Sequence, residues 1–359
     1  MKKIGFIAIR LSIGNELFLR NYLLYSRFDP ELLIDSEAAS DLHAQRIWSG
    51  KSSLNYFFSF INVFSWFPLL SFIFRQKTIY ILSSHPLNII ACIGARLFRT
   101  KCVIHIHDPI PHSTNKTFFR KFVFLSQLIS VWLSNRVIVS GERLKDDVVC
   151  HYKVPKEKIS ICFLGAHRNL DSIVSRGASG FRQFRVLVIG RIEFYKGIDL
   201  FVEASKYLIL NLPDKNIVFT IAGQGDGSWV NHMLSSCSEL RFEFINEFIS
   251  NDRFDDLVRE SRCVVLPYRD ATQTGTVQIA NGFGVPCVVT NCGSLPELIC
   301  KSGVNGLVVE PNARDIALGV SKVLGSSASF NSEDIFEYAQ KQFNWRIRAH
   351  DFDQVIISE

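Results

Sequence analysis

Apolar runs of strand length alternate with segments of helical spacing along the whole chain, and a turn separates each run from the next segment. Such alternation is typical of βαβ units, in which helices join parallel strands. The predicted strands are residues 3–9, 78–82, 101–108, 136–141 and 159–163 in the first half, and 186–189, 217–221, 242–245, 263–267 and 284–290 in the second. The pattern therefore predicts an α/β protein.

The length of the chain favours two domains, because 359 residues exceed what one ordinary hydrophobic core encloses. The polar stretch 166–182 is interpreted as the linker between them. We expect a first α/β domain over residues 1–165 and a second over 166–334. The last segment, 335–359, is expected to be helical and to pack back onto the first domain.

The strand–turn–helix unit at residues 186–204 is the first candidate for chemistry. Gly190 turns the backbone where the strand ends, and Arg191 and Lys196 lie between that strand and the next helix. A forked cation and a point cation beside a helix N-terminus, where amides also point outward, suit a diphosphate. The alternative is a surface turn with two solvated cations.

A second anion-binding loop is predicted at residues 268–280, where a loop runs into a helix. Thr274, Gly275 and Thr276 present amides and hydroxyls at that helix start. The turn at 222–227 contains glycines that permit close backbone approach. Two helix starts suited to anions in one domain point to a phosphate-bearing ligand.

A histidine-rich strand and loop at residues 101–112 form the candidate site of the first half. His105 and His107 lie on one side of the strand because side chains alternate, and Asp108 follows at the carboxyl end, where α/β ligand sites form. A structural histidine that caps the strand is the alternative. With His112 the set also invites a metal, although three ligands in one rigid strand and loop rarely converge.

The segment 54–74 is apolar over a length that also suits a transmembrane helix. Polar residues recur at helical spacing from Asn55 to Ser65 as one narrow stripe, and Pro68 is expected to break the far end. Three alternatives remain open. They are a core helix with a weakly polar edge, a helix in the membrane interface, and a true span, which would split the sheet.

A further apolar helix is predicted over residues 118–133, with Arg120 and Lys121 at its start. Core packing is the default interpretation, and a basic, aromatic helix at a membrane surface is the alternative. The apolar residues on one face of this helix are Phe118, Phe122, Leu125, Ile129, Trp132 and Leu133.

The composition indicates the redox state of the cysteines and the distribution of charge along the chain. Nine scattered cysteines without a Cys-x-x-Cys pair favour reduced thiols over a disulfide framework or zinc site, and the start of the chain does not read as a signal peptide. Residues 1–165 hold 21 Lys and Arg against 11 Asp and Glu, whereas residues 166–359 hold 19 against 23. The basic first half suggests an anionic partner: phosphate, nucleic acid or a membrane face.

The motifs of the second half resemble the GT-B-fold glycosyltransferases of family four, strongly over residues 186–311 and more weakly over 78–165. The resemblance implies two Rossmann-like domains that face each other across a cleft. The matching motifs, in the order and spacing of the family, are Gly190-Arg191 with Lys196-Gly197, Ala222-Gly223-Gln224-Gly225, Thr274-Gly275-Thr276, Gly284-Val285-Pro286, Gly293-Ser294-Leu295-Pro296-Glu297 and Gly303-Val304-Asn305-Gly306-Leu307.

The resemblance also implies roles for single residues. Arg191 and Lys196 match the pair that grips the diphosphate of a nucleotide-sugar, and His107 matches a histidine that faces the transferred sugar, so these three are the expected catalytic residues. Asp108 and Gly14, the latter expected in the loop after the first strand, are the acceptor-binding candidates. The expected donor-binding set is Gly190, Gly223, Gln273, Thr274, Gly275, Thr276, Val277 and Glu297.

One departure from the family pattern concerns two glutamates eight positions apart, which hold sugar hydroxyls and ribose. Ala271 and Ile279 occupy the matching positions here. Surface-polysaccharide members with a Gln-Ser-Gly-like loop resemble Gln273-Thr274-Gly275, and Asp270 or Gln273 is a candidate for the lost sugar contacts. A catalytically silent partner subunit that binds a nucleotide-sugar or a sister enzyme is the alternative.

The expected function is transfer of a sugar, with retention, from a nucleotide-sugar donor to a saccharide acceptor linked to a polyprenyl diphosphate. The setting would be surface polysaccharide biosynthesis, of lipopolysaccharide or capsule, with no cofactor and no metal. The expected location is cytoplasmic and peripheral, on the anionic inner face of the cell membrane. Nucleic acid is not expected as a partner, because no recognised binding module accompanies the positive charge.

Overall fold

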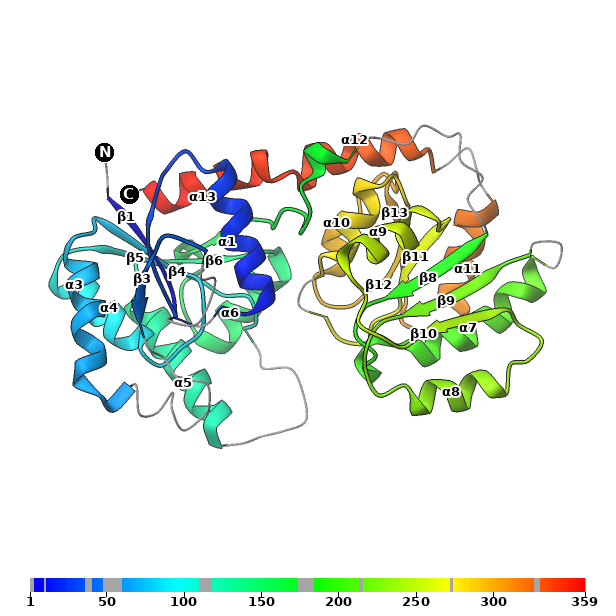
Figure 1. Ribbon diagram of the computed structural model, residues 1–359, viewed down its shortest axis with the longest axis horizontal. Coiled ribbons are helices and arrows are strands. Elements are labelled where there is room, and N and C mark those ends of the chain that lie inside the picture. Colours follow the sequence, from blue (N-terminus) through cyan, green and yellow to red (C-terminus); the bar gives the residue numbers. More distant parts are fainter. Residues whose placement is uncertain are drawn as a thin grey trace. The chain divides into compact units, whose positions relative to one another are not determined.

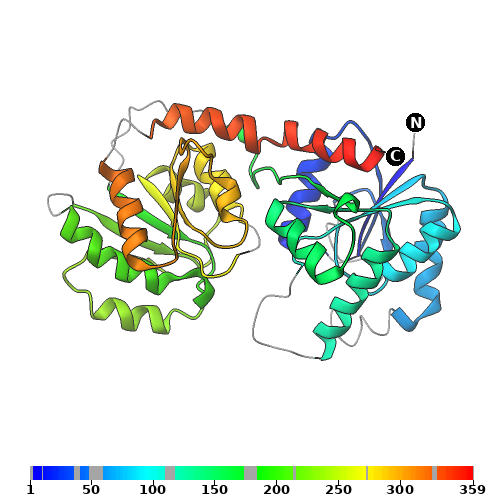
Figure 2. The same cartoon turned by 180° about the vertical axis from the view of Figure 1, so that it is seen from behind.

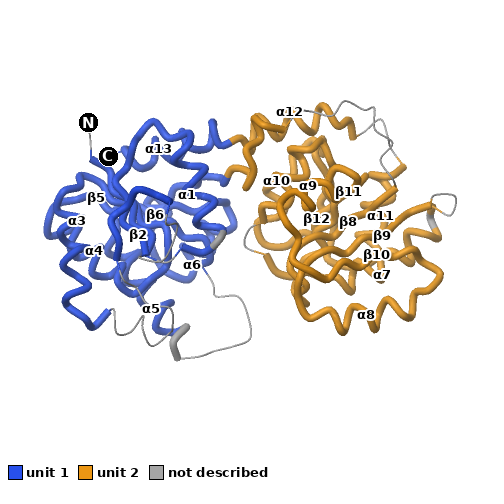
Figure 3. Tube along the Cα trace, viewed as in Figure 1, with its two compact units in different colours: residues 1–164, 345–359 blue, residues 165–344 orange. Residues whose placement is uncertain are grey.

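Two parallel sheets form, one in each half of the chain, and each has its own hydrophobic core (Figure 1). Unit 1 comprises residues 1–164 and 345–359, and unit 2 comprises residues 165–344 (Figure 3). The predicted α/β class is confirmed. The computed structural model describes residues 3–9, 11–35, 41–47, 60–109, 118–173, 184–212, 216–271, 274–325 and 330–358.

The sheet of unit 1 runs in the order β3-β2-β1-β4-β5-β6-β7, with all strands parallel. Central β1 pairs with β2 and β4, so Phe6 lies beside Leu32 on one side and Tyr80 on the other. The strand order reverses between β1 and β4, which is the switch point of this sheet. The strands are β1 (Ile4–Ala8), β2 (Glu31–Asp35), β3 (Gln45–Ile47), β4 (Thr78–Ile81), β5 (Lys101–His105), β6 (Arg136–Val139) and β7 (Ile159–Ile161).

Side chains of these strands alternate between two layers. Ile79 and Ile81 of β4 belong to the core beneath one set of helices, and Tyr80 belongs to the core on the other face. Figures 1 and 2 show the helices that cover the sheet. The first set comprises α3 (Trp66–Phe74), α4 (Asn88–Leu97), α5 (Phe118–Leu133) and α6 (Glu142–Tyr152), and the second comprises α1 (Ile13–Tyr25) and α13 (Trp345–Ile357).

Helix α13 is tied to α1 through a buried carboxylate. Asp353 accepts hydrogen bonds from the hydroxyls of Tyr22 and Ser26, at 2.5 and 2.8 Å, and from the backbone N–H of Arg27 at 2.9 Å. Burial, together with the bond to Asp353, raises the pKa of Tyr22, so this hydroxyl keeps its proton. The end of the chain is therefore an integral part of unit 1.

The return of the chain to unit 1 begins later than the expected residue 335. Helix α12 (Ser332–Phe343) belongs to unit 2, where Ala339 and Phe343 are buried in its core. The amide of Asn344 donates to Asp171 Oδ1 at 2.7 Å, also within unit 2. Unit 1 regains the chain at Trp345, which is buried among the aromatic side chains around α1.

The sheet of unit 2 runs in the order β10-β9-β8-β11-β12-β13, again with all strands parallel. Its switch point lies between β8 and β11, where Leu187 is paired with Val264. The strands are β8 (Arg185–Ile189), β9 (Val218–Ala222), β10 (Phe242–Ile245), β11 (Cys263–Leu266), β12 (Cys287–Thr290) and β13 (Gly306–Val309).

Helices cover both faces of this sheet as well. Leu187 and Ile189 of β8 belong to one core, and Val186 and Val188 belong to the other. The first core is covered by α9 (Asn251–Arg259), α10 (Thr276–Gly282) and α12, and the second by α7 (Ile198–Asn211), α8 (Ser228–Ser235) and α11 (Ala313–Gly325).

The stretch interpreted as a linker, 166–182, is partly core. Ala166, Leu170 and Ile173 are buried against unit 2, and a 3-10 turn, η3 (Leu170–Ser172), lies among them. Their three- and four-residue spacing buries one side of this turn. The interpretation as a linker was wrong for these residues because it relied on the mostly polar composition of the whole stretch. Residues 174–183 lie outside the described part of the chain.

The helix expected over residues 54–74 is interrupted. Residues 54–59 lie outside the described residues, and Asn62 begins a 3-10 turn, η1 (Val63–Ser65), by accepting from the Phe64 amide at 3.0 Å. Pro68 does not break the far end, because it lies in the first turn of α3, where its missing N–H is tolerated. Among the helices in the described ranges, none has the length and hydrophobicity needed to cross a membrane.

The apolar face predicted for α5 is buried only in part: Leu133 packs against the core, and Phe122 and Ile129 are half-buried. Leu125 and Trp132 are exposed, whereas Ser126 and Ser130 are buried, so the default of core packing is wrong for those two apolar residues. The side chain of Phe118 lies outside the described residues.

Replacing Asp353 by alanine is expected to lower the free energy of unfolding by about 3–5 kcal/mol, because hydrogen bonds to a charged group contribute about 1.5–3 kcal/mol each and the buried Tyr22 hydroxyl loses its acceptor. Urea unfolding followed by tryptophan fluorescence measures the change. The control is Glu337→Ala on exposed α12, where the carboxylate pairs with Lys341 at the surface and a change within about 0.5 kcal/mol is expected. Equal, small effects of both substitutions would contradict the role given to Asp353.

Candidate functional site

Both sheets present their candidate residues at the carboxyl edge, where parallel strands end and ligand sites form. In unit 2 the two strands at the switch point, β8 and β11, lead into Gly190 and into the loop before α10. In unit 1, β5 leads into His107 and pairs with β4 at the switch point. Each predicted set therefore gathers at the ligand edge of its own sheet, while the roles assigned to the residues stay predictions.

Glycines let the ends of β8 and β9 come together. Gly190 and Gly223 have φ values of +137° and +152°, and a Cβ on Gly223 would lie 1.7 Å from the Gly190 carbonyl oxygen. The Gly190 amide donates to Ala222 O at 2.9 Å, and the Ile192 amide donates to Gln224 O at 3.0 Å. A side chain at position 223 would force these loops apart.

The two cations of this loop have different surroundings. The Arg191 side chain is 79% exposed and makes one loose ion pair, Nη1 to Glu193 Oε1 at 3.5 Å. Lys196 ends the 3-10 turn η4 (Phe194–Lys196), with its ammonium 3.9 Å from the ring centre of Tyr268 and 5.1 Å from that of Tyr195. Burial alone would lower the pKa of Lys196, but the neighbouring Tyr268 and Tyr195 hydroxyls outweigh it and raise the pKa, so the charge persists.

Arg269 clamps the turn that carries Lys196. Its guanidinium binds Asp199 in a bidentate pair, with N–O distances of 2.6 and 2.5 Å, and lies over the Phe194 ring at 4.7 Å. Its backbone N–H donates to Tyr195 O at 2.8 Å. Because Asp199 lies in the first turn of α7, this pair fixes η4 between the start of that helix and the end of β11.

The loop before α10 is held at two points. The Thr276 amide donates to Thr274 Oγ1 at 3.2 Å, so one of the predicted anion-binding amides has a local partner. A Cβ on Gly293, at φ +49°, would lie 1.5 Å from the Ala271 carbonyl oxygen. Val277 is buried in the core of the unit. Gln273 lies outside the described residues.

Glu297 completes the described part of the predicted donor set. It is half-buried in the 3-10 turn η5 (Leu295–Leu298), which follows β12 at the same carboxyl edge. The motif that begins at Gly293, whose backbone packs against Ala271, therefore carries its carboxylate four residues after that contact.

His167 contacts this loop, and sequence reasoning missed it. A Cβ on Gly275 would lie 2.6 Å from the His167 ring, so the ring packs directly against the loop. Burial and the adjacent Arg168 lower the pKa of His167, which favours the neutral imidazole. The buried spacing of Ala166 and Leu170 was the signal that this stretch belongs to unit 2.

The positions of the two missing family glutamates face the core. The side chains of Ala271 and Ile279 are buried in the hydrophobic core of unit 2. Asp270, one of the two residues suggested for the lost sugar contacts, is exposed in the same loop. The structure thus has a carboxylate next to position 271 but an aliphatic side chain at 279.

In unit 1, His105 and His107 lie on the same side of the strand, as predicted, with ring centres 4.0 Å apart. His105 is buried, with Nδ1 2.7 Å from the Tyr80 hydroxyl and Nε2 3.1 Å from the Ser140 hydroxyl. Burial, and to a lesser extent His107, lowers the pKa of His105 well below its usual range. His105 is therefore the structural histidine, while His107 is half-buried and followed by exposed Asp108.

Gly14 does not lie in the loop after β1, as the sequence suggested, but in the first turn of α1. Ser12 caps that helix by accepting from the Asn15 amide at 3.2 Å. A Cβ on Gly14 would meet open space, so packing does not require glycine there.

Within the described ranges, no group of three or more His, Cys, Asp and Glu side chains is arranged to hold a metal ion. His112 lies outside those ranges. All nine cysteines are free thiols.

Comparison with known families identifies the domain that these loops belong to. Residues 183–326 match the model of the family described as "Glycosyl transferases group 1". This stretch contains every motif of unit 2 on which the resemblance rests. Residues 183–326 are therefore similar to this family, and the resemblance to glycosyltransferases that the motifs indicated is confirmed.

Among the curated relatives is an uncharacterized glycosyltransferase of Methanocaldococcus jannaschii, 29% identical over 220 residues, which cover 57% of this chain and 54% of the relative. A second relative is the UDP-Gal:alpha-D-GlcNAc-diphosphoundecaprenol alpha-1,3-galactosyltransferase of Escherichia coli, 25% identical over 248 residues, covering 65% and 62%. The chain spans about half the length of the first of these relatives.

Solved structures match over nearly the whole chain. HepE of Anabaena in complex with UDP has a TM-score of 0.76 at 14% identity, covering 99% of both chains. WaaG, a glycosyltransferase involved in lipopolysaccharide biosynthesis, has a TM-score of 0.66 at 14% identity, covering 99% of this chain and 100% of WaaG. The fold is that of the GT-B glycosyltransferases.

The clamp on η4 is expected to behave as a coupled pair in a double-mutant cycle of Arg269→Met and Asp199→Asn. The bidentate, partly shielded geometry predicts a coupling of about 1 kcal/mol or more in the free energy of unfolding. The exposed pair Glu337–Lys341 serves as the control, with a coupling below about 0.5 kcal/mol. Additive effects at Arg269 and Asp199 would show that the clamp does not hold the turn.

Acidification is expected to destabilise the protein through His105. Below about pH 6.5 the unfolded histidine takes up a proton while the buried one does not, so stability falls as pH falls, by up to about 1.4 kcal/mol per pH unit for one such group. His105→Gln should remove the contribution of His105 to the change of unfolding free energy with pH between about pH 6.5 and pH 5. The contribution of His167 should remain. Unfolding free energies measured by urea titration at several pH values decide this. An unchanged slope in His105→Gln would contradict the assignment.

Proposed function

We propose that the protein transfers a sugar from a nucleotide-sugar donor to a saccharide acceptor. The observation that carries the proposal is the Gly190–Lys196 loop at the carboxyl edge of unit 2. Two cations stand there beside the start of α7, inside the stretch that matches group 1 glycosyl transferases. HepE was solved with UDP and with UDP-glucose, which supports uridine diphosphate as the first donor nucleotide to test.

The donor residues suit the charge that transfer creates. As the bond between the sugar and the diphosphate breaks, negative charge grows on the departing nucleoside diphosphate. Exposed Arg191 can fold onto a ligand as a two-pronged donor, while Lys196 offers a charge held in place by Tyr268 and the Arg269 clamp. Together with the first amides of α7 they would stabilise that charge without a metal ion.

Unit 1 would supply the group that meets the transferred sugar. We assign this role to His107, whose ring is supported by His105 and lies edge-on to Phe18 at 6.3 Å. Asp108, exposed next to it, and Gly14, at the start of α1, are the proposed acceptor contacts. Retention of anomeric configuration is part of the proposal and rests on the resemblance to family four.

The proposed acceptor is a saccharide on a polyprenyl diphosphate, used in surface polysaccharide synthesis, of lipopolysaccharide or capsule. The Escherichia coli relative is named for a diphosphoundecaprenol-linked substrate, and the fold is shared with enzymes of lipopolysaccharide assembly. A lipid-linked acceptor places the protein at the inner face of the cell membrane, as a peripheral protein. The excess of basic residues in 1–165 suits that anionic surface, and no nucleic-acid partner is proposed.

The rival is a catalytically silent subunit that binds a nucleotide-sugar or a sister enzyme. The buried Ala271 and Ile279, in place of two glutamates, favour it. Exposed Asp270 beside position 271 favours activity, because it can supply a carboxylate to sugar hydroxyls. Transfer or slow donor hydrolysis by the purified protein separates the two candidates.

Lys196→Ala is expected to weaken UDP binding by about tenfold to a hundredfold, since a hydrogen bond to a charged group is worth about 1.5–3 kcal/mol. Turnover should fall further, because charge grows in the transition state. Arg191→Lys should not restore function, since a point charge replaces a fork. His107→Ala should reduce turnover at least about a hundredfold while UDP binding stays nearly unchanged. Calorimetry with UDP and a UDP-sugar hydrolysis assay measure both quantities.

The matched control is Lys206→Ala, which removes an exposed lysine from the same helix, α7, outside the loop. It should alter neither UDP affinity nor turnover. Wild-type binding and turnover in both Lys196→Ala and Arg191→Lys would contradict the proposal. The loop would then be a surface turn with two solvated cations. Weakened UDP binding without any wild-type turnover would favour the silent subunit.

A further inference from the structure

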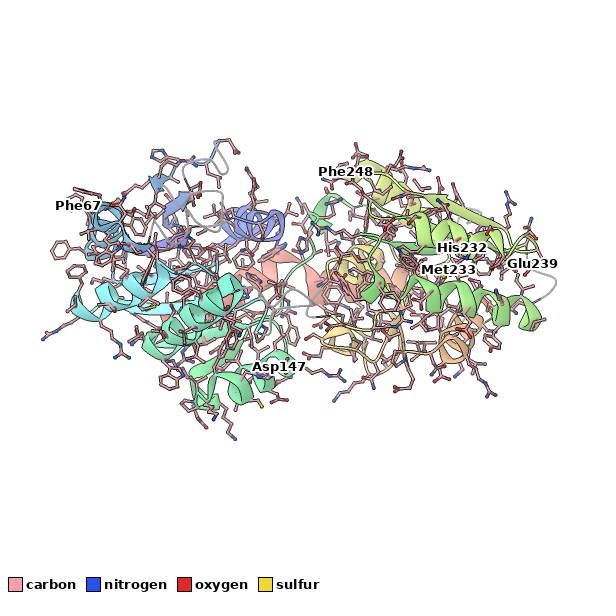
Figure 4. All side chains as sticks on the ribbon, turned by 90° about the horizontal axis from the view of Figure 1, so that it is seen from below. Phe67, Asp147, His232, Met233, Glu239 and Phe248 are labelled. Atoms are coloured by element: carbon pink, nitrogen blue, oxygen red, sulfur yellow. The ribbon has the colours of Figure 1, made fainter. Side chains whose placement is uncertain are left out.

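Three neighbouring helices of unit 1, α3, α4 and α5, expose large apolar side chains on the side that faces away from the sheet. They cover one face of the sheet, and their exposed residues include Phe67 at 77%, Leu97 at 73% and Trp132 at 55%. Figure 4 shows Phe67 at the outer surface of unit 1. Single exposed apolar residues are ordinary, but a run of them over three adjacent helices is not.

Helix α4 is apolar on the outside and small on the inside. Its buried residues are small or polar: Asn88, Ala91, Cys92, Gly94 and Ala95. The side chain of Leu70 in α3 packs close to Gly94, because a Cβ on Gly94 would lie 2.5 Å from Leu70 Cδ2. A larger residue at position 94 therefore would not fit against α3, and the large side chains of α4 that are exposed are Ile93 and Leu97, followed by Phe98.

Helix α5 also buries small polar residues. Ser126 and Ser130 are buried, and their hydroxyls donate to the carbonyls of Val123 and Ser126 in their own helix, at 2.6 and 2.7 Å. The hydroxyls are thus satisfied without water, while Leu125 lies on the exposed side with Trp132. Small residues at helix contacts and large apolar residues outside are typical of helices whose solvent is lipid.

The exposed side chains form one continuous surface. The rings of Phe74 in α3 and Phe98 after α4 meet edge to face with centres 5.3 Å apart, and Phe60 meets Phe122 of α5 at 5.9 Å. Phe64 in η1, at 89%, extends the surface beyond the start of α3. We call this surface the apolar helix face, with Phe64, Phe67, Phe74, Leu97, Leu125 and Trp132 as its main residues.

Cations outnumber acids around the apolar helix face, where Glu31 accepts a hydrogen bond from the Gln76 side chain between Arg75 and Lys77. From residue 42 to residue 141 the sequence holds eleven Lys and Arg, with Asp108 as the single acidic residue. Exposed cations near the face are Arg75, Lys77, Arg96, Arg99 and Lys121. In the described part of the chain these five make no ion pair with a carboxylate.

We propose that the apolar helix face docks onto the surface of an anionic lipid bilayer, with Phe64 and Phe67 inserted below the headgroups and Arg75, Lys77, Arg96 and Arg99 against the phosphates. Apolar side chains bordered by cations are what an interfacial lipid-binding surface requires. The docking site deepens the proposed function, which places a lipid-linked acceptor at a membrane, and names the surface that would bring the protein there.

The site would also orient the acceptor edge. Each of α3, α4 and α5 returns the chain to the start of the next parallel strand, so its first turn lies at the carboxyl edge of the sheet. Phe64 and Phe67 therefore stand at the edge that carries His107 and Asp108. Insertion there holds the acceptor loops of unit 1 close to the headgroups, where the diphosphate of a lipid-linked saccharide lies.

The test is co-sedimentation of the full chain with vesicles of equal parts phosphatidylglycerol and phosphatidylcholine. The wild type is expected to bind these vesicles, and to bind pure phosphatidylcholine far less. The double variant Phe64→Ser, Phe67→Ser should lose at least about tenfold in partition for each phenylalanine, because burying one contributes more than the roughly 1.4 kcal/mol that a tenfold change requires. Raising salt from about 0.1 M to about 1 M shortens the Debye length from about 10 Å to about 3 Å and should weaken binding of the wild type.

The matched control is the double variant Leu210→Ser, Leu318→Ser, which removes two exposed leucines from α7 and α11 of unit 2 and should bind vesicles like the wild type. Both double variants change exposed side chains, so their melting temperatures should stay near that of the wild type. Vesicle binding that survives loss of Phe64 and Phe67 overturns the docking site. Self-association that depends on these two residues, without vesicle binding, overturns it in favour of a second copy.

Donor binding separates this proposal from the proposed function. UDP affinity, measured by calorimetry, should be the same in the wild type and in Phe64→Ser, Phe67→Ser. If UDP binds but anionic vesicles do not, the docking site fails and the glycosyltransferase proposal stands. If vesicles bind as expected but UDP does not, the reverse holds.

Discussion

Contact between backbone atoms at the carboxyl edge of the second sheet is the constraint on which the donor loops depend. At three places a carbonyl oxygen occupies the space that a side chain would need: Gly190 O at Gly223, Pro267 O at Gly197, and Ala271 O at Gly293, with a Cβ at 1.7, 1.9 and 1.5 Å. Each glycine joins the end of one strand to a neighbour's loop. The motifs that identify the family are thus first of all conditions for packing these loops together, and the outward amides and cations follow from that packing.

The two cations of the donor loop, Lys196 and Arg191, are stabilised by different surroundings. Lys196 is partly buried, and a buried ammonium is costly unless polar or π-electron groups surround it. Tyr195 and Tyr268 supply that environment, and the Arg269–Asp199 pair fixes the turn. Arg191 is left in water with one loose partner. Lys196 therefore provides a charge that is already in place before a ligand binds. The exposed Arg191 guanidinium has room to turn toward a ligand.

The two helix layers of unit 1 differ in which side chains they bury and which they expose. One helix layer, α1 with α13, encloses aromatic side chains and the buried Asp353. The other layer buries Leu69, Phe72 and Ile73 of α3, but at α4 and α5 it also packs through alanine, glycine and serine, and it exposes phenylalanine, leucine and tryptophan. Serine hydroxyls that bond to their own helix allow Ser126 and Ser130 to be buried without water. The same arrangement that keeps the helices close therefore leaves the apolar helix face outside.

Local pattern was sufficient for the α/β class, the parallel sheets, most strands and the order of the donor motifs, because strand runs, helical spacing and turn glycines act within a few residues. Tertiary contacts decided the rest. Strand β3 has only three residues, too few for a clear period, and residues 166–173 are core because of what they pack against. His167 meets Gly275 from more than a hundred positions away, and Arg269 meets Asp199 from 70 positions away. The burial of Leu125 and Trp132 in α5 was predicted wrongly because hydropathy ranks them above serine, whereas Ser126 and Ser130 occupy the close contacts of that helix.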